Sequence, residues 1–137
     1  MSNPAERIAN FIDNWPESRE QNRKAFIRLK DHLAAKPGVT LDFQERPNVT
    51  YSLRAVHENL KDKPLFAMVD VIDEKPRWLS VCFYGEMIRD PEDKGDFVPE
   101  GLLGEDALCF DVEEYDEDLI RYIEARLDEA YESAAGN

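Results

Sequence analysis

The most constraining feature of this sequence is that the spacing of its apolar residues changes twice along the chain. From Ile8 to Leu33 the apolar residues recur every three or four positions, the period of a helix with one buried face. From Val39 to Val112 they mostly alternate with polar residues, the period of a strand. A helical stripe returns after Asp116. Helices, then strands, then a helix is an order that favours the α+β class.

Local signals divide the first helical stretch into two helices. Asn3 followed by Pro4 is typical of a helix start, because the Asn side chain caps free amides and Pro has no amide to cap. Pro16 interrupts the pattern. Ser18 with Gln21 three residues later predicts a capping box that opens the second helix.

The alternating region predicts strands over 39–44, 49–55, 65–73, 77–84 and, more weakly, 107–112. The connection between the first two predicted strands and that between the third and fourth are both short, so each of these pairs must be antiparallel. We therefore predict a two-layer α+β sandwich: a mostly antiparallel sheet of about five strands, two N-terminal helices and one C-terminal helix. The predicted core contains, from the helices, Ile8, Phe11, Phe26, Leu29, Ile123 and Leu127 and, from the sheet, Leu41, Leu53, Val69, Val81 and Phe83.

The length and composition fit one domain, 1–137, without repeats or linkers. The exception to regular patterning is the acidic segment 85–106, which we predict to be a long loop or lid. Its apolar residues Phe97, Leu102 and Leu103 could cover a face of the sheet.

Acidic residues outnumber basic ones by 30 to 17, and the formal net charge is -13. This charge repels nucleic-acid phosphates and anionic membranes, so we expect neither as a direct partner. The acidic charge could instead serve solubility, the binding of metal cations or of a basic partner, or mimicry of nucleic acid. The N-terminal residues lack a signal-peptide pattern and no apolar run reaches membrane-spanning length, which favours the cytoplasm. Cys82 and Cys109, which form no CxxC motif, read as inert core thiols.

Alternation also places unusually apolar residues on the side of the sheet away from the predicted core. Trp78, Ser80, Cys82 and Tyr84 share one parity, and Phe66, Met68 and Ile72 of the neighbouring strand join them. A face left to water would be more polar, so something covers it: the loop 85–106, or a ligand or partner. In the second case the binding residues are Arg54, His57, Phe66, Met68, Trp78 and Tyr84.

Metal binding and catalysis are the alternatives. Asp90, Glu92 and Asp96 offer carboxylates in the acidic segment, although Lys94 and Gly101 occupy ligand positions of a calcium loop. The acids from Glu113 to Asp118 suit the start of a helix instead. No nucleophile elbow, zinc-protease motif or phosphate-binding loop is present in the sequence.

Several segments resemble the YdhG-like family of small bacterial domains. They are Ile8-Ala9-Asn10-Phe11-Ile12 with Pro16-Glu17, Pro64-Leu65-Phe66-Ala67, Leu108-Cys109-Phe110-Asp111-Val112 and Glu124-Ala125-Arg126-Leu127. The family includes members described as frataxin-like iron chaperones, so the resemblance implies carboxylate-mediated iron binding without catalysis.

From the residues themselves we expect a non-catalytic binding domain, without a cofactor, that uses the aromatic sheet face for a small ligand or a protein partner. An acidic iron-binding chaperone is the alternative. An enzyme of unknown class comes third.

Overall fold

The computed structural model describes residues 3–136. Within that range the chain forms three α-helices, one short 3-10 helix and six strands. In order they are α1 (Pro4–Asp13), α2 (Asn22–Ala34), β1 (Val39–Arg46), β2 (Thr50–His57), β3 (Ala67–Ile72), β4 (Trp78–Tyr84), η1 (Gly85–Met87), β5 (Asp96–Leu102), β6 (Glu105–Val112) and α3 (Glu117–Gly136). The α+β class and the placement of the helices agree with the sequence.

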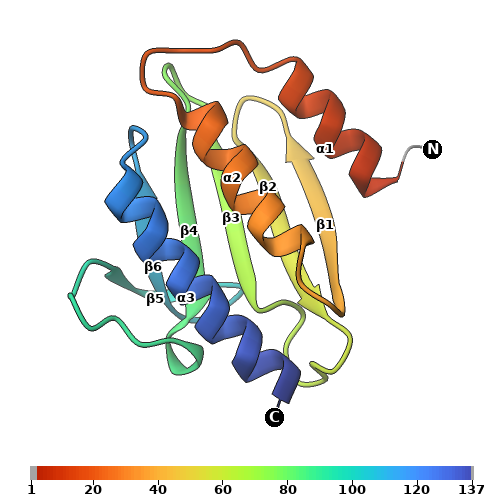
Figure 1. The fold of residues 1–137 in the computed structure, drawn as a ribbon, viewed down its shortest axis with the longest axis vertical. Helices are drawn as coiled ribbons and strands as arrows, with labels where there is room; N and C mark the ends of the chain where they lie inside the picture. The colour runs from red at the N-terminus through yellow and green to blue at the C-terminus, as the bar shows by residue number, and fades with distance from the viewer. Residues whose placement is uncertain (1–2, 137) are drawn as a thin grey trace.

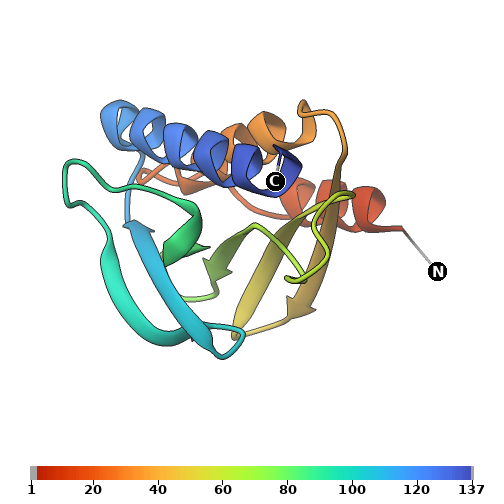
Figure 2. The same cartoon turned by 90° about the horizontal axis from the view of Figure 1, so that it is seen from below.

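All six strands belong to one open sheet in the order β1-β2-β3-β4-β6-β5, and every neighbouring pair is antiparallel. The helices lie together on one side of it, with α2 and α3 crossing the strands and α1 beside β1 (Figures 1 and 2). We call the opposite side the outer sheet face. The predicted count of about five strands was one too low, because β5 was not recognised.

The two N-terminal helices begin in different ways. The Asn3 side chain accepts a hydrogen bond from the Glu6 amide at 2.9 Å, so the predicted cap of α1 is confirmed. Helix α2 begins at Asn22 behind Gln21, which has a left-handed backbone with φ of 59° and makes no side-chain cap. The predicted capping box at Ser18 was therefore wrong. None of the helices within 3–136 combines the length and apolarity that crossing a bilayer requires.

The main core fills the space between the helices and the sheet. Phe26, Leu29 and Leu33 of α2 are fully buried there, as are Ile123 and Leu127 of α3. The predicted core residues all belong to this cluster except Leu41, which is partly buried and packs against its edge. The helical stripes and the strand alternation thus placed the core correctly.

The segment 85–106, predicted to be an irregular loop or lid, instead contains η1, β5 and the first residues of β6. Strand β5 pairs with β6 through a two-residue turn, Leu103-Gly104, whose φ values are 50° and 88°. Positive φ at both positions is the geometry that joins twisted antiparallel strands. A bulge between Val98 and Leu102 bends β5, and a side chain at Gly101 would collide with Val98.

A second, smaller apolar core lies on the outer sheet face. It contains Leu65, Met68, Cys82, Tyr84, Leu102, Ala107 and Cys109. Cys82 and Cys109 stand directly opposite each other on β4 and β6 and form a disulfide bond, with their Cα atoms 4.1 Å apart. The expectation of two separate, inert thiols is therefore corrected.

Candidate functional site

The outer sheet face carries a row of polar side chains that crosses four strands. Strand pairing aligns the row in the order Ser52 on β2, Asp70 on β3, Ser80 on β4 and Asp111 on β6. On one side of the row lies the second core. On the other side Ile72 and Trp78 pair across β3 and β4. We call the region formed by Asp70, Ile72, Trp78, Ser80 and Asp111 the open half of the face.

The open half is partly exposed because the second core covers only the other end of the face. Leu102 is fully buried in that core, as the lid hypothesis required of it. Phe97 and Leu103, which were expected to cover the face too, remain 64% and 51% exposed. Trp78 belongs to neither core, and its indole N–H donates to Glu74 at 3.0 Å.

The predicted binding residues do not all share one face. Arg54, Met68, Trp78 and Tyr84 lie on the outer sheet face, where Arg54 donates to the Ser52 hydroxyl at 3.2 Å. His57 and Phe66 are buried on the helix side, and their rings pack edge-on against the ring of Tyr131 on α3. Neither can take part in a site on the outer face.

His57 and Phe66 lie inside for different reasons. His57 has the parity of Leu53 and Ala55 on β2, so alternation directs it toward the helices. Its Nδ1 atom accepts a hydrogen bond from the Asn59 amide at 3.0 Å. Phe66 precedes the first residue of β3, so the alternation of that strand does not extend to it.

Tyr84 is fixed within the second core. The ammonium group of Lys63 lies 5.0 Å from the centre of its ring. Burial, and then the nearby charge of Glu105, raise the pKa of the Tyr84 phenol. The buried hydroxyl has no hydrogen-bond partner among residues 3–136. The ring of Tyr84 therefore contributes packing to the second core.

Asp70 is a half-buried carboxylate at the centre of the polar row. Burial raises the pKa of its carboxyl, while a hydrogen bond with Ser52 and the charge of Arg54 act in the opposite direction. One carboxyl oxygen, Oδ1, is inaccessible to water and has no hydrogen-bond partner within the described chain. Buried carboxyl oxygens in folded proteins normally accept at least one hydrogen bond, and this one accepts none from residues 3–136.

Asp111 lies at the β6 end of the same row. Burial raises the pKa of its carboxyl, and repulsion from Asp96 and Glu113 raises it further. Asp96 lies on the outer side as well, opposite Cys109 in the neighbouring strand. Negative charge thus accumulates on this part of the outer sheet face.

The carboxylates of the metal hypothesis have other roles or no close companions. Asp90 accepts hydrogen bonds from the Lys94 and Gly95 amides at 3.0 and 2.8 Å and from the Tyr122 hydroxyl. Burial raises the pKa of Asp90, but these hydrogen bonds outweigh it and leave the pKa below its usual value. Within residues 3–136 no three His, Cys, Asp or Glu side chains gather at a spacing suited to one metal ion.

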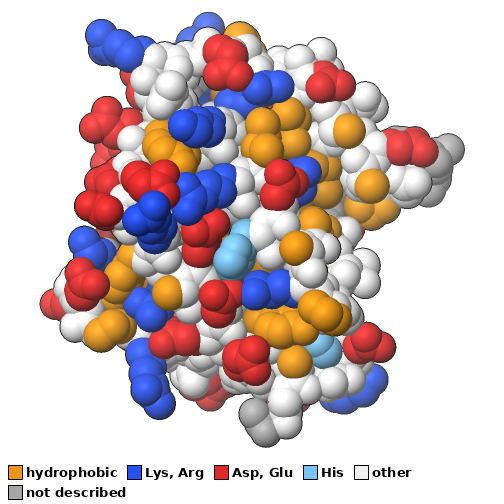
Figure 3. Space-filling model, viewed as in Figure 1, with side chains coloured by type: hydrophobic (Ala, Val, Ile, Leu, Met, Phe, Trp, Pro, Cys, Tyr) orange, Lys and Arg blue, Asp and Glu red, His pale blue; other side chains and the backbone are white. Residues whose placement is uncertain are grey.

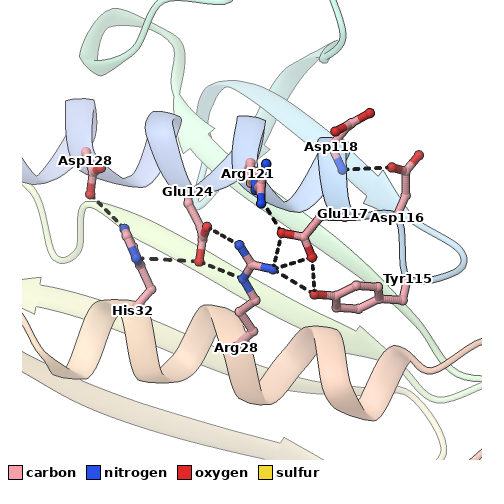
Figure 4. Close-up of polar contacts among 9 residues, drawn as sticks. All are labelled: Arg28, His32, Tyr115, Asp116, Glu117, Asp118, Arg121, Glu124 and Asp128. Carbon is pink, nitrogen blue, oxygen red and sulfur yellow. Dashed lines mark hydrogen bonds and ion pairs between the residues drawn. The ribbon is translucent and has the colours of Figure 1, made fainter.

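The helix layer carries a network of ion pairs that joins α2 to α3 (Figure 4). Arg28 donates to Glu117 and Glu124, with closest contacts of 2.7 and 2.9 Å. His32 lies 2.8 Å from Asp128 and 3.6 Å from Glu124. Hydrogen bonds from Arg28 and Tyr115 lower the pKa of Glu117 to about 2. Glu117, Glu124 and Asp128 of α3 therefore pair with Arg28 and His32 of α2, and these contacts hold the two helices together.

An apolar groove between α1 and α2 is a competing site. Figure 3 shows hydrophobic side chains gathered there, and the groove has a volume of about 490 Å³. Its lining comprises Ala5, Ile8, Ala9, Ile12, Asp13, Ile27, Lys30, Ala34 and Leu41. Lys30, its one cation, already pairs with Asp31 at 2.5 Å. The lining therefore gives no indication of what the groove would bind.

No protein-family model, no curated protein and no solved structure gives a significant match to this chain. The resemblance to the YdhG-like family therefore stays a hypothesis, as does the iron binding that it implies.

Proposed function

We propose that this chain is a non-catalytic binding domain whose outer sheet face receives a protein partner. The observation that carries the proposal is the composition of the open half, where Trp78 and Ile72 lie beside the half-buried Asp70. A partly exposed tryptophan is a typical anchor of protein interfaces. The exposed carboxylate of Asp111, in the same region, can accept a hydrogen bond from a partner.

The shape of this surface favours a protein over a small molecule. Its side chains stand on β3, β4 and β6, and adjacent strands are about 4.8 Å apart. They are therefore spread over a broad surface, whereas small ligands are usually enclosed by a concave one.

The alternative functions lack such an observation. Ser52 and Ser80 have no histidine beside them to act as a base, because His32 lies in the helix layer and His57 in the main core. The cysteines are bonded to each other. The iron-carrier hypothesis rests on Asp90, Glu92 and Asp96, and the first of these is occupied by hydrogen bonds within the chain.

Site-specific photo-crosslinking in living cells tests the proposal without knowledge of the partner. Benzoylphenylalanine would replace Ser80 on the open half or, as a control, Glu132 on the exposed side of α3. We expect a discrete crosslinked product from position 80 that is absent from position 132 and disappears when Trp78→Ala is added. No product at position 80, or the same products from both positions, would contradict the proposal.

A further inference from the structure

The acidic side chains of the two faces are neutralised to different extents. On the helix side, Glu117 and Glu124 pair with Arg28. On the outer sheet face, Asp70, Asp96 and Asp111 form no ion pair with any residue in 3–136. The negative charge of the sheet face is therefore compensated less than that of the helix side, with Arg54 acting on Asp70 only from a longer distance.

The strand register sets how these groups are spaced. Asp70 and Asp111 flank Ser80, one strand away on either side, so their backbones lie roughly 10 Å apart. Trp78 is two residues from Ser80 on β4, about 7 Å along the strand, and on the same face. A planar cation above Ser80 would be within reach of both carboxylates and of the indole ring.

Two features of this arrangement favour a cation from outside the chain. Asp70 forms no ion pair within residues 3–136, although a hydrogen bond with Ser52 and the more distant charge of Arg54 act on its carboxyl. Burial and then repulsion from Asp96 and Glu113 raise the pKa of Asp111, which lies on the other side of Ser80. A positive group placed between the two residues would attract both carboxylates, since charge-assisted hydrogen bonds are the strongest available to a carboxylate.

The spacing selects the kind of cation. A single metal ion needs its oxygen ligands within about 2.6 Å, and carboxylates two strands apart do not meet that condition. A guanidinium or ammonium group at the end of a flexible side chain spans the gap and also binds to the face of a tryptophan ring. The net charge of -13 attracts a basic protein toward this surface.

We propose that the open half of the outer sheet face binds a basic segment of a partner protein, with an arginine or lysine side chain lying over Ser80 between Asp70 and Asp111 and against Trp78. This inference rests on the proposed function and adds the chemistry of the partner. Ile72, paired with Trp78 across the strands, provides the apolar contact beside the cation.

Titration with N-acetyl-hexaarginine amide at 0.15 M salt tests the inference, with binding followed by the NMR signals of the two tryptophan indoles. The signal of Trp78 should shift, while that of Trp15, which is buried in the main core, should not. Asp70→Asn and Asp111→Asn should each raise Kd by about tenfold or more. The same peptide with citrulline in place of arginine should not bind.

Asp62→Asn is the matched control, because it removes the same charge from an exposed residue that makes no ion pair within the described chain. Equal weakening by Asp62→Asn and Asp70→Asn would mean general attraction to an acidic protein, and would overturn the inference. So would the absence of binding. In either case a crosslinked product from position 80 would still support the proposed function, because that experiment does not depend on the charge of the partner.

Discussion

The Cys82–Cys109 bond should make a large contribution to the stability of the oxidised protein. The two cysteines are 27 residues apart in sequence, so the bond closes a loop of that size in the unfolded chain. Loop-closure entropy for this length corresponds to about 3.5 kcal/mol at 25 °C. A loss of that size should lower the urea midpoint by roughly 2 M and the melting temperature by roughly 10 °C.

Equilibrium urea unfolding with and without a phosphine reductant measures this contribution. The wild-type chain should lose stability when reduced, whereas the Cys82→Ala/Cys109→Ala double variant should unfold at the same urea concentration in both buffers. Mass spectrometry of the alkylated protein establishes that reduction is complete. A wild-type midpoint unchanged by complete reduction would refute the expected contribution of the Cys82–Cys109 bond to stability.

Two further predictions concern the main core and the helix layer. Phe83 is fully buried and packs edge-on against Phe110 at 5.9 Å, so Phe83→Ala should cost about 3 to 5 kcal/mol in urea unfolding. The pKa of Glu117 lies at about 2, below its unfolded value, so its stabilisation is complete above roughly pH 4.5 and is lost as pH falls toward 2. The stability of Glu117→Gln should therefore decline less steeply than that of the wild type in this pH window.

The main features of the fold could be predicted because they follow from apolar spacing. The stripe of Phe26, Leu29 and Leu33 and the alternation of β2 and β4 each specify one buried face. Strand β5 was missed because Pro99 lies within it and because its turn uses Leu103 at positive φ, where sequence rules expect Asn or Gly. The disulfide was missed because it depends on the register of β4 against β6.

The candidate site was only partly predictable. Parity placed Trp78 and Tyr84 on the outer sheet face, and the same rule, applied to His57, would have excluded it. Asp70 was overlooked although it shares the parity of Met68, because an isolated acid in a strand resembles a solvated one. Asp70 is half-buried because β3 lies between β2 and β4, an arrangement that the sequence around Asp70 does not reveal.

The acids of the open half should lower the stability of the fold, in contrast to Glu117. A carboxyl whose pKa is raised by folding stabilises the protein while it is protonated, and this contribution is lost as pH rises through the raised pKa. Ionisation of Asp70 and Asp111 is therefore unfavourable to folding, the expected condition of residues kept for binding. Asp70→Asn and Asp111→Asn should raise the urea midpoint at pH 7, while the control Asp62→Asn leaves it unchanged. The gain should shrink at pH 4, where the wild-type carboxyls take up protons. If either open-half variant proved less stable than the wild type at pH 7, that carboxylate would be satisfied within the chain and would have no need of a cation from a partner.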